Sequence, residues 1–543
     1  MLIVKRLRKT DIFDKLLYLN TFYYKMPTKI LRILVFIIAL LTNLPSEANT
    51  LLTDSINSDK NGLSLHKDSV WVDKVTGKIM HQQKLVGVDT LVVIKPNPWK
   101  ALYTDIGIDA AVLAWDRFVQ TREYSEITHN VLHQHFSNKP VWDNDSFSGN
   151  QFAHPYHGAM CYNAARNAGL SYGASLFYPV LGSFTWEYMC ETNEPAINDM
   201  LSTGIGGAAV GEVTNRAADI ILDDSKVGIN RVIREMVGIA LNPVRALDRI
   251  LSGEMWRVSP SRGKRYAPQP YSIEMGLGYR NMKEERGNGD NLYVPYIDFY
   301  FNYGERFSSD GGKSKPFDLF SISLLANIDS NHPTIGLAEI SGRLADIQIK
   351  NSDTWSFDFG LYQNLKYVDH YSKNSPKPHN FSLISEAVSF GGGVYAQHET
   401  DKICLFNDFM LSAVPFGGSS SDYYSVRRYN YGLGYSIRNT AHFTLNQKAS
   451  FGTRIYIMQL FTPNGYSPEK FIHKIENKEL INTMGDKGHH LIFTQSIYGL
   501  VNLNKNIRFN IEYEYYRRCS YYKYFNNVKA LSHEWKCGFI YSI

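Results

Sequence analysis

Cysteine is scarce in this sequence, and the cysteines present form no paired motif. They are Cys161, Cys190, Cys404, Cys519 and Cys537. No two of them stand in a CxxC arrangement, so their spacing gives no support for a zinc ribbon or a thioredoxin-like redox centre. Cys519 and Cys537 are placed to allow a disulfide in an oxidising compartment, but isolated buried thiols are the interpretation that we favour.

Long apolar runs and dense positive charge are also missing. Beyond the N-terminus, no segment offers the roughly 20 uncharged apolar residues that a transmembrane helix needs. The net charge of +5 is small for 543 residues, and no Lys/Arg stripe marks a nucleic-acid surface. A Gly-x-Ser-x-Gly nucleophile elbow is absent as well. These absences exclude an inner-membrane helical protein and give no case for nucleic-acid binding.

The N-terminus carries a secretory signal. Met26 opens a short basic region, and residues 33–41 form an uninterrupted apolar run that is too short to span a bilayer. Ser46 and Ala48 place small residues before a cleavage site. Residues 1–48 are therefore predicted to be a signal peptide, with Met26 as the alternative true start.

A polar lead-in and a helical region follow the signal. Residues 49–98 are irregular, and we expect them in the periplasm. In residues 99–255, apolar side chains recur three and four positions apart, which predicts four or five helices. Asn242 and Pro243 predict the start of the last helix, and Gly253 predicts its end.

Glycine pairs within the helical region predict close packing. Gly169 and Gly173, like Gly207 and Gly211, are four residues apart and would share one helix face. Glycine there lets neighbouring backbones approach closely. Because each glycine costs a soluble helix up to about 1 kcal/mol, close packing or contact with lipid is needed to offset the loss.

Residues 270–543 alternate with a period of two, which predicts β-strands. The strands are long, one face carries glycine and charge, and the apolar face ends repeatedly in aromatic residues. Tyr and Phe are abundant, at 36 and 29 residues. We predict an α+β chain, in which the helical domain precedes an antiparallel transmembrane β-barrel of about 12 strands in the cell outer membrane. The predicted strands centre near residues 275, 298, 322, 341, 361, 388, 409, 433, 451, 496, 512 and 536.

The stretch from Asn150 to Glu212 is the densest polar segment in apolar surroundings. Glu187, Glu191 and Glu194 are spaced at i, i+4 and i+7, so one helical face would carry three carboxylates. Such a face beside two histidines could hold a metal or a proton-transfer pair. The candidate catalytic residues are His154, His157, Glu187, Glu191, Asp199 and Glu212.

A structural role is the alternative that we favour for these residues. Pro155 lies between His154 and His157, so we do not expect the two imidazoles on consecutive helix turns as in a zinc helix. The histidines would cap the next helix, and the carboxylates would pair with Arg166 and Arg216. We accordingly predict no metal and no cofactor.

Several motifs in this stretch resemble the domain-of-unknown-function family 3943. The residues that carry the resemblance are Asn150, His154-Pro155, Gly158, Ala165-Arg166, Gly169, Ser183, Trp186-Glu187-Tyr188, Asn198-Asp199, Thr203, Gly207 and Gly211-Glu212. The resemblance covers about residues 95–255 and implies no activity, because the family is uncharacterised. Ala196 stands where the family pattern has Ser, which argues against a hydroxyl role at that position.

Three functions fit these observations. The first is an outer-membrane barrel with a periplasm-facing helical accessory domain at its mouth, which works in envelope transport or organisation. The second is an outer-membrane enzyme that acts on lipid or lipopolysaccharide, and the third is a surface receptor or adhesin. Outer-membrane lipid is the expected partner, with lipopolysaccharide or periplasmic proteins as further candidates.

Overall fold

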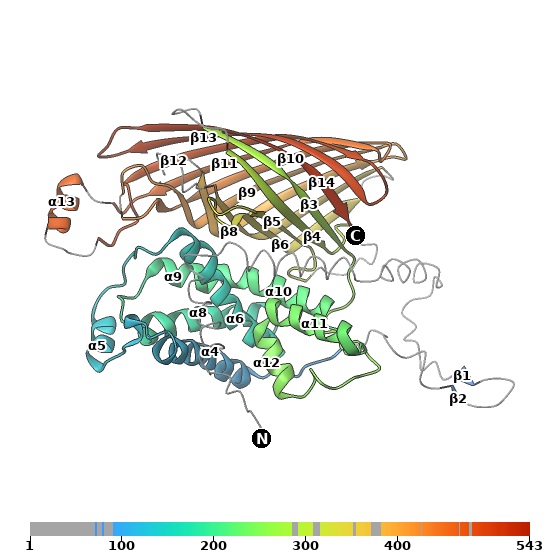
Figure 1. The fold of residues 1–543 in the computed structure, drawn as a ribbon, viewed down its shortest axis with the longest axis horizontal. Coiled ribbons are helices and arrows are strands. Elements are labelled where there is room, and N and C mark those ends of the chain that lie inside the picture. The colour runs from blue at the N-terminus through green and yellow to red at the C-terminus, as the bar shows by residue number, and fades with distance from the viewer. Residues whose placement is uncertain are drawn as a thin grey trace, which may run out of the picture.

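The chain forms a bundle of helices followed by a β-barrel (Figure 1). The computed structural model describes residues 71–72, 79–80, 91–284, 292–307, 315–350, 354–370, 382–424, 426–465, 467–476 and 481–543. The predicted signal peptide and most of the predicted lead-in lie outside the described residues.

The helical domain contains more helices than the four or five predicted, because several are short and are joined by π-helical turns. The α-helices are α4 (Pro98–Phe118), α5 (His129–Ser137), α6 (His154–Asn167), α7 (Tyr172–Ser175), α8 (Phe177–Thr185), α9 (Ile197–Leu201), α10 (Gly207–Ile221), α11 (Gly228–Leu241) and α12 (Pro243–Leu251). The π-helical turns are η3 (Gly149–Ala153), η4 (Trp186–Cys190) and η5 (Ser202–Gly206). Among the described residues, no helix is both long enough and apolar enough to cross a membrane.

The last helix begins and ends as predicted. The side chain of Asn242 accepts a hydrogen bond of 2.9 Å from the backbone N–H of Arg245, and Pro243 occupies the first turn of α12. Gly253 follows the helix with a φ of +75°, the left-handed conformation that glycine adopts at low cost.

Only one of the two predicted glycine pairs brings two helices together. A Cβ on Gly207 would lie 2.5 Å from the carbonyl carbon of Gly158, and a Cβ on Gly211 would lie 2.6 Å from Tyr162 Cδ1. Glycine therefore lets α10 pack directly on α6. Gly169 instead follows the end of α6 with a φ of +84°, and Gly173 has open space at its Cβ position.

Twelve antiparallel strands close into a barrel, as the period of two predicted. Every predicted strand centre falls within an observed strand. The strands are β3 (Tyr271–Glu284), β4 (Leu292–Tyr303), β5 (Phe320–Asn327), β6 (Ile335–Lys350), β7 (Trp355–Asp369), β8 (Leu383–Glu399), β9 (Ile403–Ser420), β10 (Tyr429–Leu445), β11 (Ala449–Thr462), β12 (Gly488–Asn502), β13 (Ile507–Tyr522) and β14 (Val528–Ser542). Pairing of β14 with β3, for example Gly538 opposite Gly278, closes the barrel.

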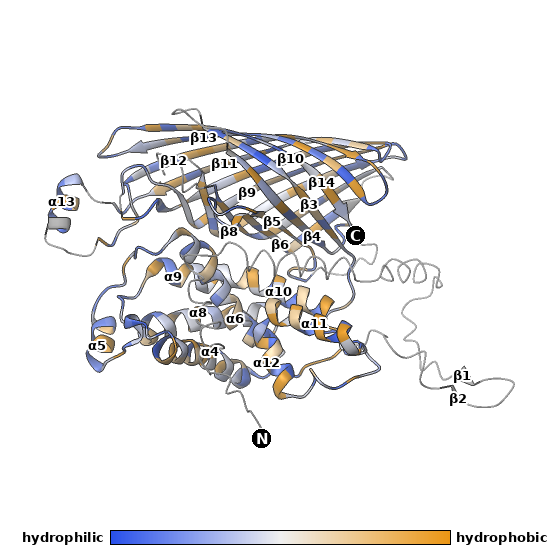
Figure 2. Ribbon diagram, in the orientation of Figure 1, coloured by the Kyte–Doolittle hydropathy of each residue, from blue (hydrophilic) through white to orange (hydrophobic). Residues whose placement is uncertain are grey.

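Along the strands, hydrophobic and hydrophilic residues tend to alternate (Figure 2). On β10, Leu433 and Tyr435 point outward and are 47% and 45% exposed. Ser436 and Arg438, on the opposite face, lie inside the barrel. On this strand the charge therefore faces the lumen and the outward face is largely apolar, as a lipid-facing barrel requires.

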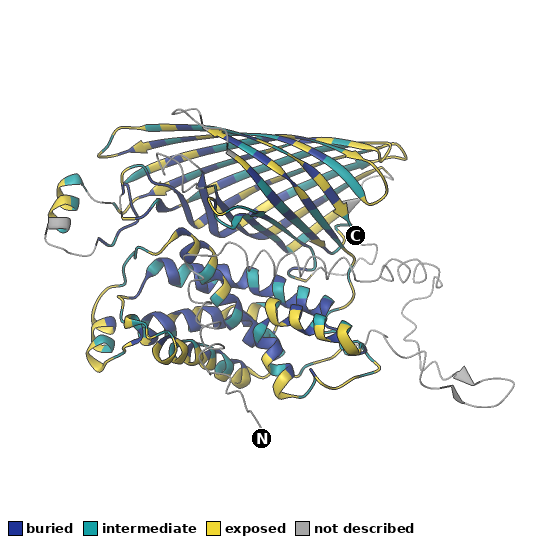
Figure 3. Ribbon diagram, in the orientation of Figure 1, coloured by how far each residue is buried: buried dark blue, intermediate teal, exposed yellow. Residues whose placement is uncertain are grey.

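The helical domain packs against the outer wall of the barrel and does not cover its mouth, which corrects the predicted placement. Helices α10 and α11 form one apolar cluster with outward-facing side chains of β3 to β7. A second cluster joins Phe147 to outward-facing side chains of β6 to β10, including Tyr429 and Tyr431. Residues buried on the barrel-facing side of the helices appear dark in Figure 3, whereas the far side of α4 and α12 is largely exposed.

Candidate functional site

The helical domain buries several carboxylates, and the exposed side of α4 is largely apolar. On α4, Asp105, Asp109 and Asp116 are buried, whereas Tyr103 and Phe118 are 69% and 80% exposed. Buried carboxylates need hydrogen bonds or cations to offset their loss of hydration. The side chains that could donate such hydrogen bonds or carry such a positive charge come from α6 and from the segments around α9.

The side chain of His154 lies between two carboxylates. It is the first residue of α6, and its Nε2 lies 3.2 Å from Asp145 Oδ2 and 3.3 Å from Asp199 Oδ1. Nδ1 lies 3.3 Å from the hydroxyl of Thr203. Burial alone would lower the pKa of His154, but the neighbouring carboxylates, Asp145 foremost, raise it above its ordinary value.

Glu187 and Glu191 belong to the same group of acids. Glu187 lies in η4, is 1% exposed, and accepts a hydrogen bond of 2.8 Å from the backbone N–H of Ala196. Burial, reinforced by Glu191, holds the pKa of Glu187 well above its ordinary range. Burial also raises the pKa of Glu191 to about 8. We refer to Asp143, Asp145, His154, Glu187, Glu191 and Asp199 as the carboxylate cluster.

The predicted face of three carboxylates does not form. The π-helical turn ends at Cys190, and Glu191 adopts an extended conformation with φ −138° and ψ 164°. Glu194 lies beyond the helix and accepts a hydrogen bond of 3.2 Å from Asn482 in the segment between β11 and β12. The prediction from helical spacing was wrong because the helix ends before Glu191, the second of the three carboxylates.

Glu212 is separate from the carboxylate cluster and is the partner of both arginines. Its Oε2 lies 2.8 Å from Arg166 Nε, and its Oε1 lies 2.9 Å from Arg216 Nε. The hydroxyl of Tyr162 donates to the same carboxylate at 2.8 Å. Burial alone would raise the pKa of Glu212, but Arg166 and Arg216 lower it. The predicted arginine pairing is therefore confirmed for Glu212 and wrong for Glu187.

The two histidines share one helix but face different partners. Pro155 is in the first turn of α6, where proline is tolerated, so His154 and His157 lie three residues apart in one helix. The argument that Pro155 keeps the two imidazoles off consecutive helix turns was therefore wrong. His157 Nε2 lies 3.1 Å from Asp109 Oδ1 on α4. Its ring meets the ring of Trp186 edge to face, with centroids 5.4 Å apart.

Sequence analysis missed Asp109, Asp143 and Asp145. The first of these is separated from His157 by 48 positions, and only the packing of α4 on α6 brings them together. A usable signal was present in the spacing of Asp105 and Asp109, because two acids four residues apart share a helix face. The apolar residues of the same helix were interpreted as its buried face, so the spacing of the two aspartates was overlooked.

Charged side chains also cross the barrel lumen. Arg438 on β10 pairs with Glu339 on β6 at 2.9 Å and with Glu386 on β8 at 2.8 Å. Strands β7, β8 and β9 separate β10 from β6 around the barrel, so the first pair spans the lumen. Tyr456 on β11 donates to Glu386 at 2.7 Å.

Apolar side chains fill the lumen next to these pairs. Strands β7, β8, β11, β12 and β13 contribute the inward-facing cluster Val368, Ile384, Tyr456, Met458, Leu460, Ile492 and Tyr516. Together with the Arg438 ion pairs, this cluster narrows the described part of the lumen.

Comparison with known families identifies the central part of the helical domain. Residues 139–244 match the model described as Domain of unknown function (DUF3943). The matched segment contains the motif residues that hold the domain together. Gly158 and Gly207 make the close helix contact, and Arg166 and Glu212 make the ion pair. No curated protein matches the chain.

Solved outer-membrane barrels are similar to part of the chain. The NanC porin is 12% identical, with a TM-score of 0.25 over 49% of this chain and 98% of that one. The Pseudomonas putida toluene transporter TodX is 10% identical, with a TM-score of 0.22 over 51% and 90%. The outer membrane channel DcaP of Acinetobacter baumannii is 8% identical, with a TM-score of 0.22 over 50% and 96%.

The closed barrel itself decides the class, because it combines twelve antiparallel strands with an apolar outer wall and a charged lumen. This is an outer-membrane β-barrel protein. Its DUF3943 segment lies in the helical domain that packs on that barrel.

Proposed function

We propose that the protein works in transport across the outer membrane, through a barrel that Arg438 holds closed in this conformation. The observation that carries the proposal is the charged lumen. A barrel that served only as an anchor would gain more from an apolar interior, because buried ion pairs are often no more stable than packed apolar residues. Charges that line a lumen instead suit polar cargo, and an ion pair across it suits a gate.

The helical domain joins the barrel at the end that carries its shortest connections. Residues 400–402, 446–448 and 503–506 form these turns, and β3 begins at the same end as the chain leaves α12. Short turns are typical of the periplasmic end of outer-membrane barrels. We infer that the helical domain is attached on the periplasmic side and extends from there along the wall.

Outer-membrane lipid is the partner that we propose for the exposed apolar surfaces. On the barrel these include Leu277, Ile347 and Phe539, which are 60%, 68% and 56% exposed. The exposed face of α4, with Tyr103 and Phe118, adds an apolar surface to the docked helical domain. The buried aspartates of α4 are compatible with such a position, because they lie on the side of the helix opposite this exposed face.

The experiment compares the conductance of the full-length protein and two variants in planar lipid bilayers. Arg438→Ala removes the side chain that bridges β10 to β6 and β8, and it should raise the open probability or the single-channel conductance several-fold over wild type. Arg517→Ala is the matched control, because that arginine lies on the outer wall and is fully exposed. Arg438→Ala protein that folds into a barrel but conducts no better than wild type would argue against transport and for a role in envelope organisation.

A further inference from the structure

Two facing helices each bring a pair of potential metal ligands to one place. Asp105 and Asp109 are four residues apart on α4, and His157 and Cys161 are four residues apart on α6. Residues at this spacing lie on one helix face, one turn from each other. Metal sites in helical bundles are commonly built from such pairs on facing helices.

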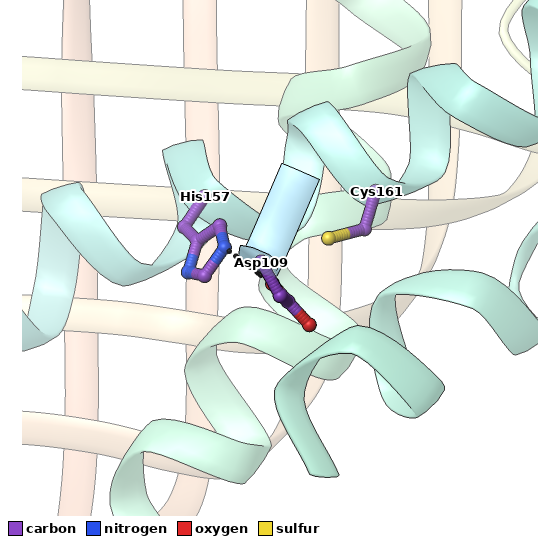
Figure 4. Close-up of side chains that lie close together, drawn as sticks. All are labelled: Asp109, His157 and Cys161. Atoms are coloured by element: carbon purple, nitrogen blue, oxygen red, sulfur yellow. Dashed lines mark hydrogen bonds and ion pairs between the residues drawn. The ribbon is translucent and has the colours of Figure 1, made fainter. Parts of the chain in front are cut away.

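Three of these side chains lie close together (Figure 4). The nitrogen of His157, the sulfur of Cys161 and a carboxylate oxygen of Asp109 all lie within 4.8 Å of one another. In Figure 4 the side chain of Asp109 lies between the other two. The imidazole and the thiol therefore face the same carboxylate from consecutive turns of α6.

The fourth side chain lies beside the thiol. A Cβ built on Gly182 of α8 would lie 2.6 Å from Cys161 Sγ and 3.0 Å from Asp105 Oδ1. Both atoms thus lie against the same glycine, and any larger residue there would displace them. Gly182 leaves room for the sulfur and the carboxylate to approach each other.

The carboxylates of this group lack the partners that buried charges require. Asp105 and Asp109 are 0% and 1% exposed. Among the described residues, the thiol of Cys161 is the hydrogen-bond neighbour of Asp105, and Oδ2 of Asp109 has no hydrogen-bond partner. The ion pair described for these two acids is the one between Asp109 and His157. Buried charges in folded proteins are paired or coordinate metals, so a bound cation would supply the partner that Oδ2 of Asp109 lacks.

We propose that Asp109, His157 and Cys161, supported by Asp105, bind one divalent transition-metal ion of the zinc type. The mixed oxygen, nitrogen and sulfur donors select such an ion, because magnesium and calcium prefer oxygen ligands alone. On binding, Cys161 loses its thiol proton to solvent and ligates as a thiolate. Asp105 completes the coordination or orients Cys161. This proposal departs from the sequence-based expectation of no metal, and it does not depend on whether the lumen conducts.

The test uses Co²⁺ as a spectroscopic probe on full-length protein in detergent after treatment with a chelator. Wild type should bind one cobalt ion per chain with a thiolate-to-cobalt charge-transfer band, and Zn²⁺ should displace it. Cys161→Ser should abolish the band, and Asp105→Asn should weaken binding roughly 10- to 100-fold. Cys537→Ser is the matched control, because it removes an exposed thiol on the barrel and should leave the band unchanged.

A second measurement covers a Cys161 variant that fails to fold. Zn²⁺ should raise the melting temperature of wild type, because a ligand that binds only the native state stabilises it. Asp109→Asn should lose the gain from Zn²⁺, which is measured against the melting temperature of the same variant without metal. Absence of the cobalt band in wild type, its persistence in Cys161→Ser, its loss in Cys537→Ser or an unchanged Zn²⁺ response in Asp109→Asn would each overturn the proposal.

Discussion

The side-chain amide of Asn150 donates a hydrogen bond of 2.5 Å to the hydroxyl of Tyr431. One residue belongs to η3 of the helical domain and the other to the outer wall of β10. The contact is fully buried, and the guanidinium of Arg427 lies over the Tyr431 ring at 3.7 Å from its centroid. The domain interface is thus specific as well as apolar.

Loss of the Tyr431 hydroxyl should weaken this interface. Tyr431→Phe leaves the Asn150 amide buried with one partner fewer, which should cost about 1–3 kcal/mol. Helix melting, followed by circular dichroism of the full-length protein, should shift to lower temperature. Tyr435→Phe is the control, since Tyr435 is exposed beyond the interface and its loss should change nothing. Equal effects of both variants would contradict the docking on β10.

Neutralisation of Glu212 and of Glu187 should have opposite consequences. Glu212→Gln leaves Arg166 and Arg216 without their shared counter-charge, which should destabilise the helical domain by roughly 3–5 kcal/mol. Glu187→Gln should be neutral or stabilising, because the raised pKa of Glu187 shows that its charged form is disfavoured in the folded state. Thermal melts of the two full-length variants, side by side, provide the measurement. A larger loss for Glu187→Gln would show that its charge, and not that of Glu212, is structurally required.

Stability of the helical domain should fall as the pH rises from about 4.5 to about 8. Burial raises the pKa of Glu191 from its ordinary 4.5 to about 8, so the folded state holds a proton that the unfolded state has already lost in this window. Folding is then favoured at low pH, and the advantage disappears as the pH passes the folded-state pKa. The raised pKa of His154 acts in the same direction, because its charged form loses its proton later in the folded state.

Denaturant unfolding at several pH values tests this dependence. Glu191→Gln should flatten the profile of the helical signal, since the titrating group is gone. A profile that rises between pH 5 and 8, or one that Glu191→Gln leaves unaltered, would refute the assignment.

A charge on the exposed outer wall should impair membrane insertion. Leu433→Arg places a guanidinium where the wall is apolar and should cost about 2–4 kcal/mol if the position lies near the bilayer midplane. Leu433→Ala is the control for the lost side-chain volume and should cost less. Folding into lipid vesicles, followed by the change in gel migration on heating, reports the difference. Indistinguishable variants would mean that Leu433 does not face lipid.

The barrel was predictable from sequence because each strand has a pattern that is visible within a short segment. Alternation along residues such as Tyr429 to Ile437 repeats every two positions, so a short window reveals both the strand and its faces. The helix boundaries were less accessible. The π-helical turns around Glu187 and Thr203 leave no simple periodic mark, and α4 reverses the usual pattern by burying aspartates.

The candidate site was only partly predictable, for a geometric reason. His154, Glu187, Glu191 and Asp199 were all singled out and do meet, because polar residues in an apolar segment must find partners inside the fold. Their true neighbours, Asp143 and Asp145, come from the segment before α6. The position of the helical domain on the barrel wall could not be predicted from sequence either. Outward-facing apolar residues form the same sequence pattern whether they contact lipid or protein.

The interface between the domains also sets an order of assembly. The helical domain precedes the barrel along the chain, yet its docking surface combines outward-facing side chains from β3 through β10. That surface does not exist until those strands have paired in register. The helical domain is the first to be secreted, but it cannot complete its packing until the barrel has folded. Envelope chaperones that hold unfolded barrels would have to shelter these helices as well.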